Sequence, residues 1–221
     1  MVGNADRSAN GEVRMGLSRI HYPVTVLGYG TRVAVWFQGC SIRCRGCISQ
    51  DTWPNAASVD RVRVEDVLDR IAELDAVDGL TISGGEPFDQ PEALGELIGG
   101  FRRLGWRAEV DVLVYSGYAA AHLARVHSDE WRLADAVVTG PYLQNRSGDS
   151  MRGSAKQEVN LHSELGRARY GGDPAQRGGL QVVTAGGSIW MVGIPGEGDM
   201  ARLENGLAHR GVWLGDVSWR C

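Results

Sequence analysis

Short apolar runs alternate along this chain with longer stretches in which apolar residues recur at helical spacing. The apolar runs predict buried strands at 32–37, 79–83, 109–115 and 136–139. Helical spacing and start signals predict helices at about 64–74, 89–104 and 119–125. Strands that alternate with helices pair in parallel through right-handed crossovers, so the sequence predicts an α/β fold with a parallel sheet. We expect a partial (β/α) barrel; an open doubly wound sheet fits the same alternation.

The same pattern divides the chain into three parts. A polar, aperiodic start predicts a disordered tail at 1–11, followed by a core domain at 12–160. Gly, Ser, Arg and Asp dominate 144–179, which predicts a long loop or a partly ordered excursion. We expect 161–221 to form a loop and a small C-terminal extension packed on the core. In this extension, a Gly-rich turn predicts a hairpin, and apolar residues on one face predict a final helix.

Composition and charge argue against several classes of protein. The 221 residues are 43% hydrophobic and 23% charged, which is typical of a globular domain. A net charge of −4 gives no basic field, so we expect neither nucleic acid nor a membrane surface as a partner. No apolar run approaches the ~18 residues of a transmembrane helix. We expect no secretion signal, and three of the four cysteines are clustered, so a reducing, cytoplasmic location is predicted.

The three clustered cysteines are the clearest chemical signal in the sequence. Cys40, Cys44 and Cys47 have the spacing C-x3-C-x2-C and closely follow the predicted strand at 32–37. Three thiolates on one loop can bind three irons of a [4Fe–4S] cluster, which usually takes four cysteines, and so leave one iron open. A zinc site completed by Cys221 or a histidine is the alternative, although structural zinc sites usually combine two separated pairs. A disulfide with a spare thiol fits poorly, so the spacing favours the cluster.

Three other unusual turns follow predicted strands. They are Ser83-Gly-Gly-Glu-Pro87, Tyr115-Ser-Gly-Tyr118 and Thr139-Gly-Pro-Tyr142. One such turn alone would be only a tight connection. Ligands, however, collect at the carboxyl ends of parallel strands, so we expect the turns and the cysteines to form one site.

The residue types in these turns suit a charged, nucleoside-like ligand. Gly84 and Gly85 would expose backbone to it, and Glu86 could accept hydrogen bonds from an ammonium group. The candidates for binding ribose or carboxylate oxygens are Ser83, Ser116 and Thr139, and those for covering an adenine face are Tyr115 and Tyr118.

Together, the cysteine triplet and the turn at 83–87 resemble the radical S-adenosylmethionine (SAM) superfamily. Within it, the chain is most similar to the activating enzymes of glycyl radical enzymes, in particular the activators of anaerobic ribonucleotide reductase. Further similar motifs within about 20–160 are Val26-Leu-Gly-x-Gly30, Trp36-Phe-Gln-Gly-Cys40, Arg43-Cys44-x-Gly-Cys47, Asp51-Thr-Trp53, Tyr115-Ser-Gly-Tyr118, Gly140-Pro-Tyr142 and Arg152-Gly-Ser154. The resemblance implies a [4Fe–4S] cluster with Cys40, Cys44 and Cys47 as its catalytic ligands. It also implies SAM held by Ser83, Gly84, Gly85, Glu86, Tyr115, Ser116 and Gly117.

The implied activity is that of a radical SAM oxidoreductase. Such an enzyme cleaves SAM reductively, and the resulting 5′-deoxyadenosyl radical abstracts hydrogen. The resemblance implies that this chain acts as the activase of a glycyl radical enzyme. It also implies that a flavodoxin-like donor supplies the electrons. The chain departs from the activators at Ile48-Ser49, where His-Asn is usual, and at Thr139, where Asp is common. These departures leave open a stand-alone radical SAM enzyme that modifies a peptide or small metabolite. A non-enzymatic iron–sulfur or zinc module is the third alternative.

A few other residues carry weaker expectations. Arg152 and Lys156 could contact the SAM carboxylate or the substrate, or could be solvated loop charges. Trp36 precedes the cysteines and is expected to shield the cluster from solvent. His122 and His127 are expected at the surface, and Cys221 is expected to be a free thiol or, alternatively, a further ligand.

Overall fold

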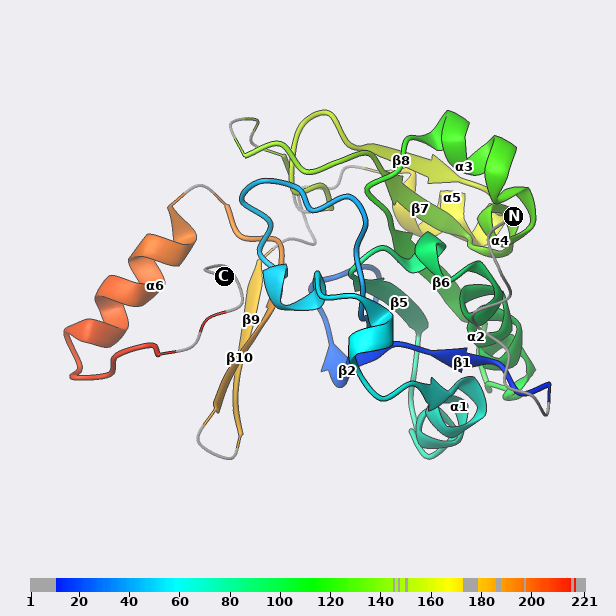
Figure 1. The fold of residues 1–221 in the computed structure, drawn as a ribbon, viewed down its shortest axis with the longest axis horizontal. Coiled ribbons are helices and arrows are strands. Elements are labelled where there is room, and N and C mark those ends of the chain that lie inside the picture. The colour runs from blue at the N-terminus through cyan, green and yellow to red at the C-terminus, as the bar shows by residue number, and fades with distance from the viewer. Residues whose placement is uncertain are drawn as a thin grey trace.

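A mostly parallel six-stranded sheet forms the centre of the protein in this computed structural model (Figure 1). The structure describes residues 11–144, 146, 148–149, 151–172, 179–185, 188–196, 198–215 and 217. The strands lie in the order β2-β3-β5-β6-β7-β8. Their bounds are β2 Leu17–Val24, β3 Arg32–Phe37, β5 Gly79–Gly84, β6 Asp111–Tyr115, β7 Ala136–Thr139 and β8 Glu158–Leu161. The four central strands run parallel, and β2 and β8 pair antiparallel at the two edges.

The central strands are buried on both faces because their sequences are almost continuously apolar. Every residue of β3 and β7 is buried. The register pairs Phe37 at the end of β3 with Gly84 at the end of β5, and Ile82 of β5 with Val114 of β6. The carboxyl ends of neighbouring strands, and the turns that follow them, therefore lie at one edge of the sheet.

Four helices pack on one face of the sheet. They are α1 Val64–Ala72, α2 Pro91–Arg103, α3 Ala120–Val126 and α4 Ser128–Leu133. Their apolar residues form one core with alternate strand residues such as Val35, Ile82 and Val114. The intervening strand residues, including Trp36 and Leu113, point to the opposite face and belong to two smaller clusters. Consecutive parallel strands are neighbours in chain order, whereas a doubly wound sheet reverses its order at a switch point.

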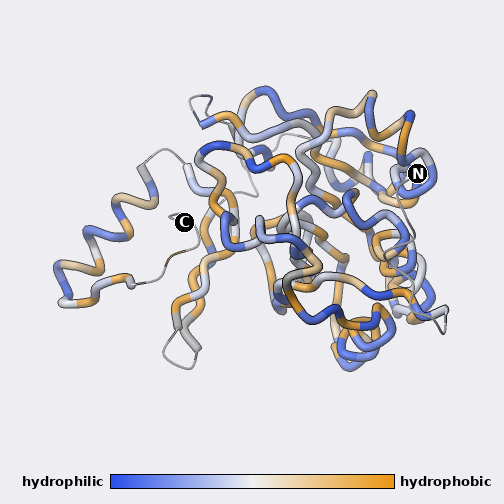
Figure 2. The backbone as a smooth tube through the Cα atoms, in the orientation of Figure 1, coloured by the Kyte–Doolittle hydropathy of each residue, from blue (hydrophilic) through white to orange (hydrophobic). Residues whose placement is uncertain are grey.

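Smaller elements complete the described chain. A short β1 (Arg14–Met15) pairs with β4 (Val62–Arg63), and the hairpin β9 (Leu180–Ala185) and β10 (Ser188–Gly193) lies beside β2 in Figure 1. Single 3₁₀ turns are η1 Gln50–Thr52, η2 Ala56–Ser58 and η3 Pro87–Asp89. The last helix, α6 (Asp199–Ala208), carries no buried residue and alternates hydrophilic and hydrophobic positions in Figure 2. In the part of the chain that the structure describes, no helix is long and apolar enough to cross a membrane.

The segment 144–179, predicted to be a long loop or a partly ordered excursion, is ordered over most of 158–170. That segment contains β8 and the helix α5 (Glu164–Tyr170). β8 is short and polar, but it pairs with β7. α5 begins with the Ser163 hydroxyl accepting a hydrogen bond from the amide of Gly166. Both elements are too short for periodicity to reveal, because they depend on partners distant in sequence.

Other differences are smaller. The edge strand β2 and the short α4 were not predicted. The strand expected at 109–115 begins at Asp111, and the predicted hairpin and final helix are present as β9–β10 and α6. Nearly all of the tail predicted at 1–11 lies outside the described residues, as does Cys221.

Candidate active site

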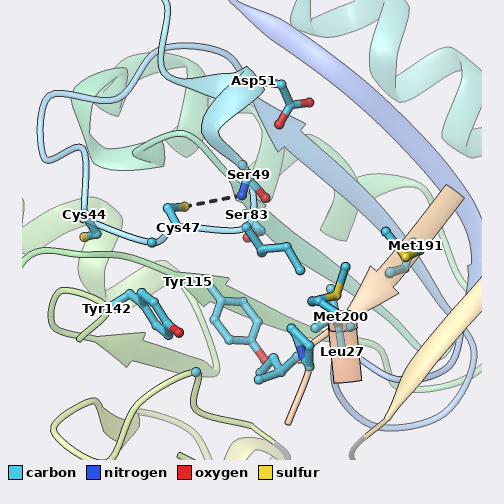
Figure 3. A pocket seen from close by; sticks show the side chains of 18 of the residues that line it. Leu27, Cys44, Cys47, Ser49, Asp51, Ser83, Tyr115, Tyr142, Met191 and Met200 are labelled. Carbon is cyan, nitrogen blue, oxygen red and sulfur yellow. Dashed lines mark hydrogen bonds between the residues drawn. The ribbon is translucent and has the colours of Figure 1, made fainter. Parts of the chain in front are cut away.

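A cavity of about 2070 Å³ opens at the carboxyl ends of β3, β5 and β6. Ligand pockets typically occupy ~300–1,000 Å³, so there is room for more than one small molecule. The residues expected to bind a cluster or SAM all line it: Cys40, Cys44, Cys47, Ser83, Gly84, Gly85, Glu86, Tyr115, Ser116 and Gly117. Figure 3 shows Cys44 and Cys47 on one side, with Met191 and Met200 across the space.

The three cysteines lie on one loop as free, half-buried thiols. The loop turns through Arg43, with φ 50°, and Gly46, with φ 78°. A backbone amide approaches two of the sulfurs: Arg43 N lies 3.5 Å from Cys40 Sγ, and Ser49 N lies 3.4 Å from Cys47 Sγ (Figure 3). Burial raises the pKa of each thiol, while such amide contacts oppose the shift. Amide hydrogen bonds to ligand sulfurs also tune the potential of iron–sulfur clusters.

The donor set suits iron. Three thiols line one cavity, each half-buried and none in a disulfide. Among the described residues, no three His, Cys, Asp or Glu side chains form a group that could hold a single metal ion.

The two glycines at the end of β5 allow its turn to pack against the chain that leads into Cys40. A Cβ on Gly84 would lie 2.5 Å from the backbone of Phe37, and one on Gly85 would lie 2.0 Å from the carbonyl oxygen of Gly39. Two backbone hydrogen bonds of 2.8 Å join the same segments, from Gly85 N to Phe37 O and from Glu86 N to Gly39 O. The two glycines line the cavity. They are also required by the backbone packing, which leaves no space for a side chain at either position.

The carboxyl group of Glu86 accepts hydrogen bonds from neighbouring groups of the protein. Its side chain is 1% exposed and accepts hydrogen bonds from Ser116 Oγ at 2.8 Å, Gly117 N at 2.8 Å and Phe88 N at 3.1 Å. Burial raises the pKa of Glu86 to about 8, although these three donors oppose the shift. An ionised carboxylate has about four acceptor positions, so one remains for a ligand.

Tyr115 presents a polar group without a partner. Its hydroxyl is buried and, within the described structure, makes no hydrogen bond. Burial raises the pKa of this phenol, so the group is a neutral donor at the cavity wall. A buried donor of this kind is normally paired, so the hydroxyl is an unsatisfied polar group in a residue that lines the cavity.

Some candidates are not at the cavity wall. Tyr118 donates to Asp89 at 2.7 Å and contacts Ser41, and it stacks on His122 with ring centroids 4.6 Å apart. His122 and His127 are half-buried in this ring cluster, so the surface position expected for them is only partly correct.

Of the two cations in the later loop, Arg152 lines the cavity but is paired with Asp149 at 2.5 Å. Lys156 is exposed and outside the lining, and the Thr139 hydroxyl is instead bonded to Asn160, 2.9 Å away.

Sequence reasoning missed the contribution of β2 and the hairpin to this site. Arg19, His21 and Trp190 line the cavity together with the cysteines. The β2 sequence alternates irregularly, and nothing in it pointed to a residue facing the cluster loop.

Comparison with known proteins places this site in a family. The family of the 4Fe-4S single cluster domain matches residues 26–160. The anaerobic ribonucleoside-triphosphate reductase-activating protein of Haemophilus influenzae is 29% identical over 147 residues, which cover 63% of this chain and 94% of that protein. The corresponding protein of Vibrio cholerae is 30% identical over 148 residues, with 63% and 94% covered.

A second group of relatives is similar over a shorter region. The pyruvate formate-lyase-activating enzyme of Clostridium pasteurianum is 32% identical over 123 residues, which cover 52% of this chain and 51% of that enzyme.

The family match and the named relatives define this chain as an iron–sulfur protein of the radical SAM class. The chain belongs to the 4Fe-4S single cluster domain family and, within it, to the radical SAM activating enzymes. The cofactors inferred from the motifs, a [4Fe–4S] cluster and SAM, are confirmed.

Proposed function

We propose that this chain cleaves SAM reductively and uses the resulting radical to abstract a hydrogen atom from a glycyl radical enzyme. The observation that carries the proposal is that the three cysteines and the Gly-Gly-Glu turn line one cavity, and that the turn is hydrogen-bonded to the backbone of Phe37 and Gly39, which lead into Cys40. The names of the relatives, activators of a ribonucleotide reductase and of pyruvate formate-lyase, support the choice of substrate.

Each group has a defined role in this proposal. Cys40, Cys44 and Cys47 would hold the cluster, which would supply the electron for reductive cleavage of a carbon–sulfur bond of SAM to methionine and the 5′-deoxyadenosyl radical. Gly84 and Gly85 offer backbone polar groups, and Glu86 offers one acceptor position to the ammonium. Ser83, Tyr115, Ser116 and Gly117 offer further polar contacts at the cavity wall.

The finer architecture belongs to the same proposal. The chain-order arrangement of the parallel strands, with helices on one face, supports a partial (β/α) barrel. We place the radical SAM core at 12–160 and an extension packed on it at 161–221. A flavodoxin-like donor and a cytoplasmic location fit a reduced cluster, and the net charge of −4 gives no reason to expect nucleic acid.

The test is anaerobic SAM cleavage. The protein is reconstituted with iron and sulfide, given SAM and dithionite, and assayed for 5′-deoxyadenosine. We expect the product from the parent and from Cys221→Ala but none from Cys44→Ala. A protein that retains zinc and binds no cluster, or a Cys44→Ala variant as active as the parent, would refute the proposal.

A stand-alone enzyme for a peptide or small metabolite is the second candidate. It is favoured by Ile48-Ser49 after the third cysteine and by the segment after residue 160, which the family does not match. Incubation with the glycyl radical enzyme of the same genome should give the electron paramagnetic resonance doublet of a glycyl radical. SAM cleavage without that doublet would favour the second candidate.

A further inference from the structure

The C-terminal hairpin lies outside the matched family domain, yet it lines the cavity. The family match ends at residue 160, whereas Trp190, Met191 and Val192 of β10 share the cavity wall with the cysteines. Met191 lies across the space from Cys44 and Cys47 in Figure 3. The hairpin therefore contributes to a site whose cluster ligands belong to the core.

The hairpin is attached to the edge strand β2 at its outer end. The side chain of Gln181 accepts a hydrogen bond from Thr25 N at 3.0 Å and donates one to Pro23 O at 2.8 Å. Val192 is 4% exposed and packs in a cluster with Val24 and Leu27. These contacts fix the hairpin to β2 but do not reach the cysteine loop.

A second attachment reaches the cysteine loop through Arg19 of β2. The guanidinium carbon lies 5.7 Å from the ring centroid of Trp36 and 6.0 Å from that of Trp190. The same guanidinium pairs with Asp51 in η1, just after the cysteines, with Nη1 2.5 Å from Oδ2. Trp190 also stacks on His21, with centroids 6.1 Å apart and planes at 18°.

These contacts are largely sheltered from water. The side chain of Arg19 is 21% exposed and that of Asp51 is 31% exposed, while Trp36 is 6% exposed. Cation–π contacts are stronger when the cation is desolvated, and Arg is well suited to them because its planar group can stack and pair at once. One side chain thus contacts the hairpin, the end of β3 and the segment after the cysteine loop.

We propose that Arg19, together with Trp190, is a positioning residue that holds the C-terminal hairpin as a wall over the cluster end of the cavity. The wall restricts access of water and dioxygen to the cluster and its open iron. An apolar shell around a metal site controls solvent access, which gives the wall a chemical purpose. The shielding part of this inference rests on the proposed function, because it requires a bound cluster. The attachment of the hairpin by Arg19 and Trp190 does not depend on the proposed function.

The test compares variants of Trp190 with a matched control. Trp190→Ala removes the stack, Trp190→Phe keeps an aromatic face, and Val126→Ala alters a 51% exposed apolar residue of α3 that does not line the cavity. Two rates are measured: thermolysin cleavage within the hairpin of the cluster-free protein, and bleaching in air of the reconstituted cluster. Arg19→Lys serves as a second probe, because it retains the charge for Asp51 but loses the flat stack.

We expect Trp190→Ala to raise both rates roughly five- to thirtyfold, which corresponds to ~1–2 kcal/mol of lost interaction. Trp190→Phe should restore most of the protection, Arg19→Lys should be intermediate, and Val126→Ala should match the parent. Unchanged cleavage in Trp190→Ala would overturn the attachment. Faster cleavage with unchanged bleaching would overturn the shielding.

The two proposals fail in distinguishable ways. A parent protein that assembles no cluster would refute the proposed function and, with it, the shielding. The cleavage rates of the cluster-free variants would still decide whether Arg19 and Trp190 hold the hairpin.

Discussion

Glu86 shows how neighbouring residues determine the chemistry of a single side chain. Its carboxyl is buried against Ser116, Gly117 and Phe88, which donate three hydrogen bonds to it. Its pKa is nevertheless raised to about 8, because burial outweighs those donors. In the absence of a cationic ligand, the folded protein therefore retains a proton on Glu86 near neutral pH.

This proton gives a pH-dependent stability. Between the usual pKa of 4.5 and the raised value of about 8, the folded state holds a proton that the unfolded state has released. The free energy of unfolding of the cluster-free protein should therefore fall as the pH rises through this window, by at most ~1.4 kcal/mol per pH unit, and level off above it.

Glu86→Gln should lose this slope, and urea unfolding at several pH values measures it. Glu96→Gln, at an exposed carboxylate paired with Arg103, should retain the slope of the parent. Equal slopes for Glu86→Gln and the parent would contradict the assignment.

At the scale of elements, the end of β5 and the cysteine loop form one packed unit. The close approach of Gly85 to the carbonyl of Gly39 leaves no space for a side chain. The conformation of the cysteine loop therefore depends on a glycine at the end of β5, which lies well after the loop in the sequence.

Gly85→Ala should displace this loop. Because the new Cβ would lie 2.0 Å from the Gly39 oxygen, we expect the free energy of unfolding to fall by ~1–3 kcal/mol and the iron bound after reconstitution to decrease. Chemical denaturation and iron analysis measure the two effects. Gly95→Ala in α2, where the nearest atom would be 3.7 Å away, should equal or slightly exceed the parent in stability. Full iron loading in Gly85→Ala would argue against the packing role.

At the opposite end of the sheet, residues of α5 bind the first residue of β6. Asp111, the first residue of β6, accepts hydrogen bonds from Arg32 Nη1 at 2.9 Å, Arg169 Nη1 at 2.5 Å and the Tyr170 hydroxyl at 2.6 Å. Arg32 and Asp111 are both 0% exposed. This buried network anchors a helix whose own sequence is too short to be stable alone.

Asp111→Asn should leave the buried Arg32 without its counter-charge. We expect a loss of ~3–5 kcal/mol in the free energy of unfolding, as is typical when one partner of a buried pair is removed. The exposed pair of Glu96 and Arg103 provides the control, since Glu96→Gln should cost less than ~1 kcal/mol. Urea denaturation compares them, and similar losses in the two variants would contradict the buried role.

At the scale of the whole molecule, the core and the C-terminal hairpin share one cavity. The hairpin packs on β2, an edge strand, so it also covers part of an otherwise open sheet edge. The hydrogen bonds of Gln181 join segments more than one hundred and fifty residues apart.

Gln181→Ala should loosen this junction without affecting the core. The loss of the three hydrogen bonds that the Gln181 side chain makes with Thr25 and Pro23 should weaken the attachment by ~1–3 kcal/mol. Hydrogen exchange followed by mass spectrometry should show faster exchange in β9 and β10, while β3 and β5 exchange as in the parent. Unchanged exchange in the hairpin would show that Gln181 does not hold it.

The sequence by itself determined the central strands and the chemistry of the site. β3 and β7 are apolar runs apart from Arg32 and Thr139 at their ends, and their bounds can be read directly because strands buried on both faces are nearly continuously apolar. The cysteine spacing and the Gly-Gly-Glu turn were sufficient for the cofactors, since these motifs are local in sequence.

Only the tertiary structure decided which side chains surround that chemistry. Thr139 and Tyr118 lie outside the cavity, and Glu86 accepts hydrogen bonds from three donors. Arg19 contacts two tryptophans that are distant from each other in sequence. The tertiary structure also formed β8 and α5, whose short polar sequences become stable through contacts with β7 and Asp111. Periodicity and spacing describe neighbours along the chain, whereas these features depend on contacts that exist only after the chain has folded.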